Sequence, residues 1–166
     1  ADVVVMVLKY NPSGNLYAVT ASISSSTITW NTAGLANIGF SGSSPSISKL
    51  STNNAIACYK KDGDTKGYCS VITVSGTTPT WNAEAKFNDA ATAYISCSAL
   101  SSTSAIVAYQ DVGNSNYGTA QVLSISGTTI TPGTEYVIEN SDNRCFSIAT
   151  MSSTSAIITF TRWDNN

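Results

Sequence analysis

The chain has 166 residues and a formal net charge of −2, and only 11% of its residues are charged. Eight thinly spread basic residues argue against a nucleic-acid partner, and no apolar run approaches the roughly 18 residues that cross a bilayer. Histidine is absent, which excludes the usual Ser-His-Asp and Cys-His arrangements of nucleophilic catalysis. Hydrophobic residues make up 42%, and abundant Ser and Thr with few helix formers predict an all-β chain.

In chain order, the first predicted element is the apolar run Val3–Leu8, which is typical of a buried strand. A strand motif that ends in an aromatic residue then returns with a period of about 50 residues, as Leu50–Tyr59, Leu100–Tyr109 and Met151–Phe160. A second motif keeps the same period, as Ser24–Trp30, Ser75–Trp81 and Ser126–Pro132. Two independent motifs with one period indicate a tandem repeat.

Each repeat holds four strand-like runs separated by turn residues. In the best-preserved copy the runs are Tyr94–Leu100, Ala105–Gln110, Gly118–Ser126 and Thr128–Ile138. The short polar links between them suit hairpins of antiparallel strands. Four such strands in about 50 residues is the signature of a propeller blade. The predicted fold class is therefore all-β, built from tandem four-stranded antiparallel repeats that resemble β-propeller blades.

We expect a single repeat domain over 1–166, made of a partial blade 1–43, blades 44–92 and 93–142, and a partial blade 143–166. The strand that ends in an aromatic residue occurs four times, at Tyr10, Tyr59, Tyr109 and Phe160, but the strand before it only three times. This gives roughly three and a quarter blades, fewer than the four to eight of closed propellers. We therefore expect the partners to be copies of the chain itself or further blades of a longer chain.

Three motifs carry a family resemblance: Ala105–Asp111, Tyr117–Ala120 and Ser126–Thr131. They resemble the divergent β-propeller repeats of bacterial and phage surface proteins, of the integrin and lectin types. The resemblance covers nearly the whole chain and implies an adhesin, a lectin or a fibre component. The Phe-Gly and Gly-Ala-Pro signature of integrin-type repeats is not intact here, which weakens any transfer of their calcium or ligand chemistry.

Catalysis without His would need paired carboxylates as acid and base. The acidic residues lie mostly in loops at positions that differ between repeats. Asp111-Val112-Gly113 resembles the Asp-box turn of sialidases, a turn that is structural in that group. We therefore expect a non-enzyme with no catalytic residue, and keep a glycosidase-type propeller enzyme as the third alternative.

Calcium is the one cofactor that the loops suggest. Asp62 and Asp64 lie in the loop Asp62–Gly67, and Asp111 begins the equivalent loop Asp111–Asn116, with Asn11–Asn15 as the first copy. Oxygen ligands on a loop bent at Gly are what calcium needs. The alternative is that Asp, Asn and Gly simply make turns here.

Trp30 and Trp81 occupy equivalent positions in the repeats. Together with Asp111 and Asn114, they are the candidate residues for binding a cell-surface glycan. The alternative for the two Trp residues is packing between blades, where a ring buries a large area. For the Tyr and Phe series that ends the repeated strand, we predict packing in the core.

The four cysteines are Cys58, Cys69, Cys97 and Cys145. Cys58 and Cys69 flank one predicted hairpin at similar distances from its loop, and Cys97 and Cys145 lie in the first strands of successive blades. Two disulfides in an oxidising compartment and buried free thiols are both open at this point.

Together these features predict a structural or adhesive module outside the cell, on a cell surface or on a virion, that acts through its repeat surfaces and through assembly. A glycan-binding lectin of propeller type is the alternative.

Overall fold

A computed structural model describes residues 2–10 and 13–163, so the first predicted calcium loop lies partly outside the described residues. Strands make up nearly all of it, with one 3-10 turn, η1 (Val112–Asn114), and the all-β prediction is confirmed. The strands are β1 (Asp2–Lys9), β2 (Asn15–Ser24), β3 (Thr27–Lys49), β4 (Asn54–Lys61), β5 (Lys66–Ser75), β6 (Thr78–Ser101), β7 (Ser104–Asp111), β8 (Tyr117–Ser126), β9 (Thr129–Pro132), β10 (Tyr136–Ser152) and β11 (Ser155–Arg162). No helix in the described part of the chain is long and apolar enough to span a membrane.

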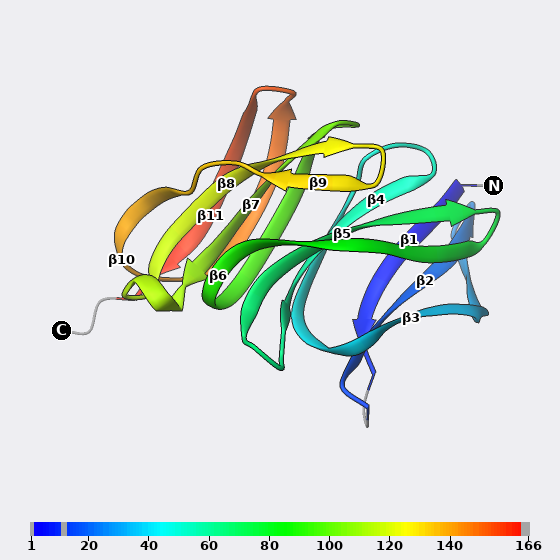
Figure 1. Ribbon diagram of the computed structural model, residues 1–166. Helices are drawn as coiled ribbons and strands as arrows, with labels where there is room; N and C mark the ends of the chain where they lie inside the picture. The colour runs from blue at the N-terminus through cyan, green and yellow to red at the C-terminus, as the bar shows by residue number, and fades with distance from the viewer. Residues whose placement is uncertain (1, 11–12, 164–166) are drawn as a thin grey trace.

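The strands follow one another in an antiparallel meander. The pairing order runs from β1 through β8 to β10 and β11, and β9 pairs with β8 beside that path. Figure 1 shows the result: β1 and β2 lie on one side of the molecule and the β10–β11 hairpin on the other. Local hairpins account for this order, because each strand pairs with its neighbour in the sequence.

Three long strands, β3, β6 and β10, pair with one neighbour over their first part and with another over their second part. Two residues into each new pairing there is a register shift and a residue with positive φ: Ser44 (52°), Tyr94 (50°) and Cys145 (54°). These bulges recur at offsets of 50 and 51 residues. The sequence predicted separate strands on either side of them, but a bulge bends a strand without ending it.

The changes of strand partner, after Ser41, Ala91 and Asp142, divide the strands into four sheets, which we call first, second, third and last. The first contains β1, β2 and β3 up to Ser41, and the second runs from Gly42 through β4 and β5 into β6. The third contains the rest of β6, β7, β8, β9 and the start of β10, and the last pairs the rest of β10 with β11.

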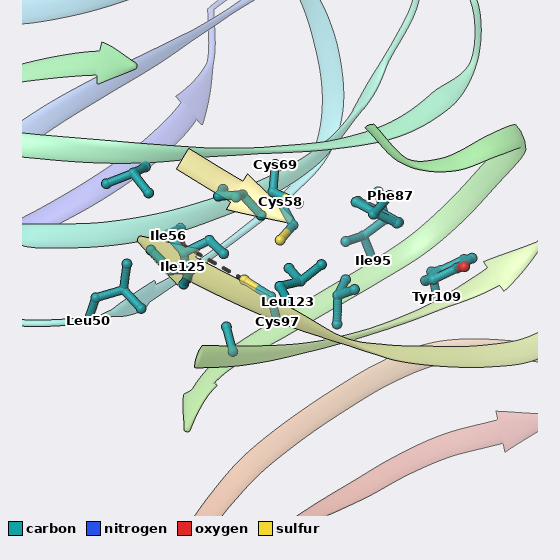
Figure 2. Packing of buried hydrophobic residues seen from close by; sticks show 14 residues of the cluster. Leu50, Ile56, Cys58, Cys69, Phe87, Ile95, Cys97, Tyr109, Leu123 and Ile125 are labelled. Carbon is teal, nitrogen blue, oxygen red and sulfur yellow. Dashed lines mark hydrogen bonds between the residues drawn. The ribbon is translucent and has the colours of Figure 1, made fainter. Parts of the chain in front are cut away.

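The sheets pack face against face, so their middle strands are buried on both sides. In β4, Ala57 packs toward Val5 and Val7 of the first sheet. The next residues on either side, Ile56 and Cys58, belong to the main core with Val107 of the third sheet (Figure 2). This alternation is the ordinary geometry of a strand, and it explains why β4 reads as an almost continuous apolar run.

Candidate functional site

A large hollow lies on the face of the first sheet that no other sheet covers. It has a volume of about 510 Å³ and is lined by apolar and aromatic side chains, with Thr32 as an exception: Met6, Leu8, Tyr10, Tyr17, Val19, Trp30, Thr32 and Leu35. Tyr10, Trp30 and Leu35 are 53%, 42% and 46% exposed. We call this set of residues the open face. Such a contiguous apolar surface on a water-exposed sheet is typical of an interaction site.

The equivalent face of the second sheet is covered. Trp81, the repeat counterpart of Trp30, packs between the first and second sheets, and its indole N–H donates to the carbonyl oxygen of Ala36 at 2.9 Å. Tyr59, the counterpart of Tyr10, is fully buried and meets the Trp81 ring edge-on at a centroid distance of 5.9 Å. The open face is therefore an inter-sheet face without its neighbour, and the packing interpretation holds for Trp81.

A smaller hollow of about 360 Å³ lies beside Trp81, where the first and second sheets meet. Its lining mixes the aromatic rings of Phe40 and Trp81 with the polar groups of Asn82 and Glu84. The Tyr59 hydroxyl donates to Glu84 at 3.3 Å, and Lys61 pairs with the same carboxylate at 2.6 Å. Burial raises the pKa of Tyr59 far above its ordinary value, so its phenol stays protonated and donates.

The same Tyr–Glu contact recurs one repeat later. Tyr109 is fully buried, and its hydroxyl donates to Glu135 at 3.0 Å and accepts from the Gln121 amide at 3.1 Å. Burial again raises the pKa of Tyr109 well above its usual range. Core packing of the aromatic series is thus confirmed for Tyr59 and Tyr109, whereas Tyr10 is exposed because no sheet covers it. A buried phenol that recurs in this way serves the packing of the sheets.

The predicted calcium residues have other partners. Asp62 accepts hydrogen bonds from Ser41 (2.8 Å) and Ser43 (2.6 Å) and pairs with Lys9 at 2.9 Å. Asp64, in the same turn, accepts from the Tyr68 hydroxyl at 2.7 Å, which raises the pKa of that phenol to about 12. Over residues 2–10 and 13–163, no group of three or more Cys, Asp or Glu side chains could hold a metal ion.

Asp62 connects the first and second sheets, and we expect this to make stability depend on pH. Partial burial alone would raise the pKa of Asp62, but the hydrogen bonds from Ser43, Lys9 and Ser41 outweigh it and lower the pKa to about 2. A folded pKa below the unfolded value adds stability above pH 4, and this is lost as pH falls toward 2. The substitution Asp62→Asn should cost about 1–2 kcal/mol at pH 7, after allowance for partial exposure.

Urea unfolding from pH 7 to pH 2 tests this expectation. The difference between Asp62→Asn and the unchanged chain should shrink over that range. A difference that stays constant down to pH 2 would contradict the role of the Asp62 charge. Asp89→Asn is the comparison variant: Lys66 and Lys86 lower the pKa of Asp89 to about 2 as well, but this carboxylate is exposed, so solvent screening should keep the cost of Asp89→Asn well below that of Asp62→Asn.

The predicted glycan residues are not brought together. Trp30 lies on the open face, and Trp81 lies beside the smaller hollow. Asp111 is 5% exposed, and its carboxylate accepts from Asn88 at 3.2 Å, which accounts for it as a structural residue. Asn114 is exposed at the end of η1, in the loop between β7 and β8. A shared ligand site of these four residues does not form within the chain.

All four cysteines are free in the structure. Cys58, Cys69 and Cys97 are buried in the main core (Figure 2), whereas Cys145 is exposed at the bulge of β10. Cys58 lies directly opposite Cys69 on β4 and β5. Further along the same ladder, the Val74 N–H donates to the Asn53 carbonyl at 2.8 Å, which marks Asn53 and Val74 as a hydrogen-bonded pair. Pairs alternate along an antiparallel ladder, so Cys58 and Cys69 form a non-hydrogen-bonded pair, whose Cα atoms lie about 4.5 Å apart.

That spacing suits a disulfide. We expect glutathione disulfide to oxidise Cys58 and Cys69, with two glutathione thiols released, and the product to be about 2–3 kcal/mol more stable. Burial raises the pKa of Cys58 well above its ordinary value, so the reaction should be faster at higher pH. Peptide mapping would identify the bond, with Cys145→Ala as a control that leaves it unchanged. A bond from Cys97 to Cys58 or to Cys69, its neighbours in the same core cluster, would contradict this pairing.

Sequence reasoning missed most of the open face. Only Trp30 and Tyr10 were singled out, and Met6, Leu8 and Leu35 were not expected to form a site. A signal was present: Met6 and Leu8 are bulky where the repeat counterparts, Ala55 and Ala57, are small. The pattern of one strand shows which residues are apolar, but not which face lacks a neighbouring sheet.

Comparison with solved structures supports the fold. A point mutant of NanB sialidase from Streptococcus pneumoniae matches with a TM-score of 0.72 at 12% identity, over 99% of this chain and 26% of that chain. A structure described as NanB plus Optactamide matches with a TM-score of 0.73 at 13% identity and the same coverage. No family model matches the chain, and no curated protein matches it in sequence. The likeness shows an all-β, propeller-like fold, and the chain spans about a quarter of those sialidase chains.

Proposed function

We propose that the chain is a non-enzymatic structural or adhesive module of a cell or virion surface, which acts through its repeat surfaces and through assembly. The observation that carries the proposal is the open face: about 510 Å³ of apolar hollow at positions that other sheets cover elsewhere in the chain. We propose that the chain comprises roughly three and a quarter four-stranded blades, whose boundaries lie near the bulges at Ser44, Tyr94 and Cys145. The bulges support the division into 1–43, 44–92, 93–142 and 143–166.

The surroundings of the carboxylates support a non-enzymatic role. Most glycosidases use two carboxyl groups facing one sugar site, whereas sialidases use a Tyr nucleophile. The two Tyr residues that contact a Glu within the described part of the chain, Tyr59 and Tyr109, are fully buried. Each acidic side chain that the structure describes instead accepts a hydrogen bond or an ion pair from within the chain: Asp62, Asp64, Glu84, Asp89, Asp111, Glu135, Glu139 and Asp142. NanB is a sialidase, but the likeness to it, at 12–13% identity, extends to the fold.

Light scattering over a range of protein concentrations tests the proposal. We expect a mass above the 17.3 kDa of one chain that rises with concentration. A well-folded particle that stays at 17.3 kDa up to millimolar concentration would overturn the assembly part of the proposal.

The smaller hollow favours one second candidate, a glycan-binding lectin. Phe40 and Trp81 offer aromatic faces there, and Asn82 and Glu84 offer polar groups, which is the mixture that sugars bind. A glycan array with and without calcium tests it, with Glu84→Gln as the variant that should lose signal. An array that stays blank under both conditions would remove the lectin function.

A further inference from the structure

The two outermost sheets of the chain each leave one face uncovered, and the two faces are opposite ones. In the first sheet the uncovered side carries Met6 and Leu8, because Val5 and Val7 on the other side pack on the second sheet. In the last sheet the uncovered side carries Ile157, because Ile158 and Phe160 on the other side pack on the third sheet. We propose that the open face of one chain binds the uncovered face of the last sheet of a second copy, in a head-to-tail contact. This inference rests on the proposed function and names its interface.

The contacts within the chain show what each face binds. At every junction between two sheets, the later sheet in the chain contributes the side that carries its Ala-x-Ala/Val/Ile-x-Tyr/Phe residues. The earlier sheet contributes its other side, the one that does not carry those residues. Between the first and second sheets these are Ala57 and Ile72 against Val5, Val7 and Ala18. Between the second and third they are Val107 and Tyr109 against Ile56, Cys58 and Val71. If the same rule holds for the open face, the sheet that covers it must present the side of its strands that corresponds to Ile56 and Cys58 in β4.

The last sheet offers that side. We call Ser147, Ala149, Ile157 and Thr159 the terminal face. The register of β10 with β11 places Ser147 opposite Thr159, as Ser46 lies opposite Cys58 and Ser96 opposite Ala108. The terminal-face residues are therefore the repeat counterparts of Ser46, Ser48, Ile56 and Cys58, and of Ser96, Ser98, Ile106 and Ala108. All four are exposed.

The polar contacts at the inner junctions show that this side binds a neighbour. The hydroxyls of Ser46 and Ser48 accept hydrogen bonds from the backbone N–H groups of Cys97 and Ala99, both at 2.9 Å. One junction later, Ser98 lies 2.8 Å from the hydroxyl of Thr150. Ser147 occupies the position of Ser46 in the last sheet, and its hydroxyl is free to make the same type of contact with a second copy.

Size and charge are also complementary. The open face presents bulky groups, above all Met6, Leu8 and Trp30. Apart from Ile157, the terminal face presents small groups, so the bulky groups can pack around Ile157 without overpacking. Neither set contains a charged residue, so the contact desolvates no ion. The two faces differ from each other, which makes the interface heterologous and leads to a closed ring or an open filament.

Two charge insertions separate this contact from other modes of assembly. Met6→Asp alters the open face, and Ile157→Asp alters the terminal face; both side chains are exposed, at 36% and 53%, so the single chain should still fold. Each variant alone should associate at least roughly 100-fold more weakly, because the contact would bury an unpaired charge. Val112→Asp is the matched control, an apolar side chain that is 41% exposed in η1, away from both faces, and it should associate as the unchanged chain does.

The decisive measurement is the mixture of the two variants. Met6→Asp keeps its terminal face and Ile157→Asp keeps its open face, so an equimolar mixture should form a 1:1 pair of about twice 17.3 kDa that grows no further. If Ile157→Asp alone still assembles, or if the mixture stays monomeric while the unchanged chain assembles, the head-to-tail contact is wrong and assembly by another surface survives. If the unchanged chain is monomeric, both the inference and the proposed assembly fall. Trp30→Ser removes the largest ring of the open face without a charge, and serves as the second variant if Met6→Asp is unfolded by circular dichroism.

Discussion

The substitution Tyr109→Ala should lower the free energy of unfolding by about 4 kcal/mol, the cost of an emptied aromatic site in a packed core. The ring is fully buried between the second and third sheets and lies 5.0 Å from the ring of Phe87, measured between centroids. Its hydroxyl also bonds Glu135 and Gln121, so Tyr109→Phe should cost about 1 kcal/mol by itself. Urea unfolding followed by circular dichroism would measure both.

The repeat supplies a matched control for this prediction. Tyr10 occupies the same position in the first sheet but is 53% exposed on the open face. Tyr10→Ala should therefore cost under about 1 kcal/mol when the chain is monomeric, as surface substitutions do. Equal losses at Tyr10 and Tyr109 would show that the aromatic series does not act through packing between sheets, and the meaning given to the open face would fail with it.

Much of the fold follows from local pattern. The almost continuous apolar runs of β4 and β7 identify strands buried on both faces, and the polar links after Ser75 and Ser126 identify hairpin turns. The joining of neighbouring repeats into β3, β6 and β10 does not follow in this way. The bulges fall on Ser44, Tyr94 and Cys145, which share no turn-forming residue type, and each lies two residues into the pairing with a new strand partner.

The candidate site was less predictable because it depends on contacts far apart in the sequence. Asp62 looked like a loop ligand, but its partners Lys9 and Ser41 come from β1 and β3. Asp111 looked accessible, but Asn88 of β6 reaches its carboxylate. Trp30 and Trp81 are alike in sequence and differ in burial, because a neighbouring sheet covers one and not the other. The repeat predicts equivalence, and the ends of the stack are where equivalence fails.

Gly67→Ala should destabilise the chain by about 2 kcal/mol through overpacking. Gly67 is the second residue of β5 and lies directly beside the ring of Phe87, so a methyl group on its Cα would lie 2.5 Å from Cε2 and Cζ of that ring. Phe87 is 4% exposed in the main core, so its ring can move away only by displacing its neighbours.

Gly63, in the hairpin loop that precedes β5, is the control for this last substitution. Nothing lies within 4 Å of a methyl group there, and its φ is not positive, so Gly63→Ala should be neutral or slightly stabilising. Chemical unfolding of the two variants side by side separates the close approach at Phe87 from a general intolerance of the hairpin to Ala. If both variants lose stability equally, the packing of β5 against Phe87 is not what requires Gly67. If only Gly67→Ala loses stability, Gly67 is required by the packing on the face that the second sheet turns toward the third. The corresponding face of the last sheet is the one left open for a second copy.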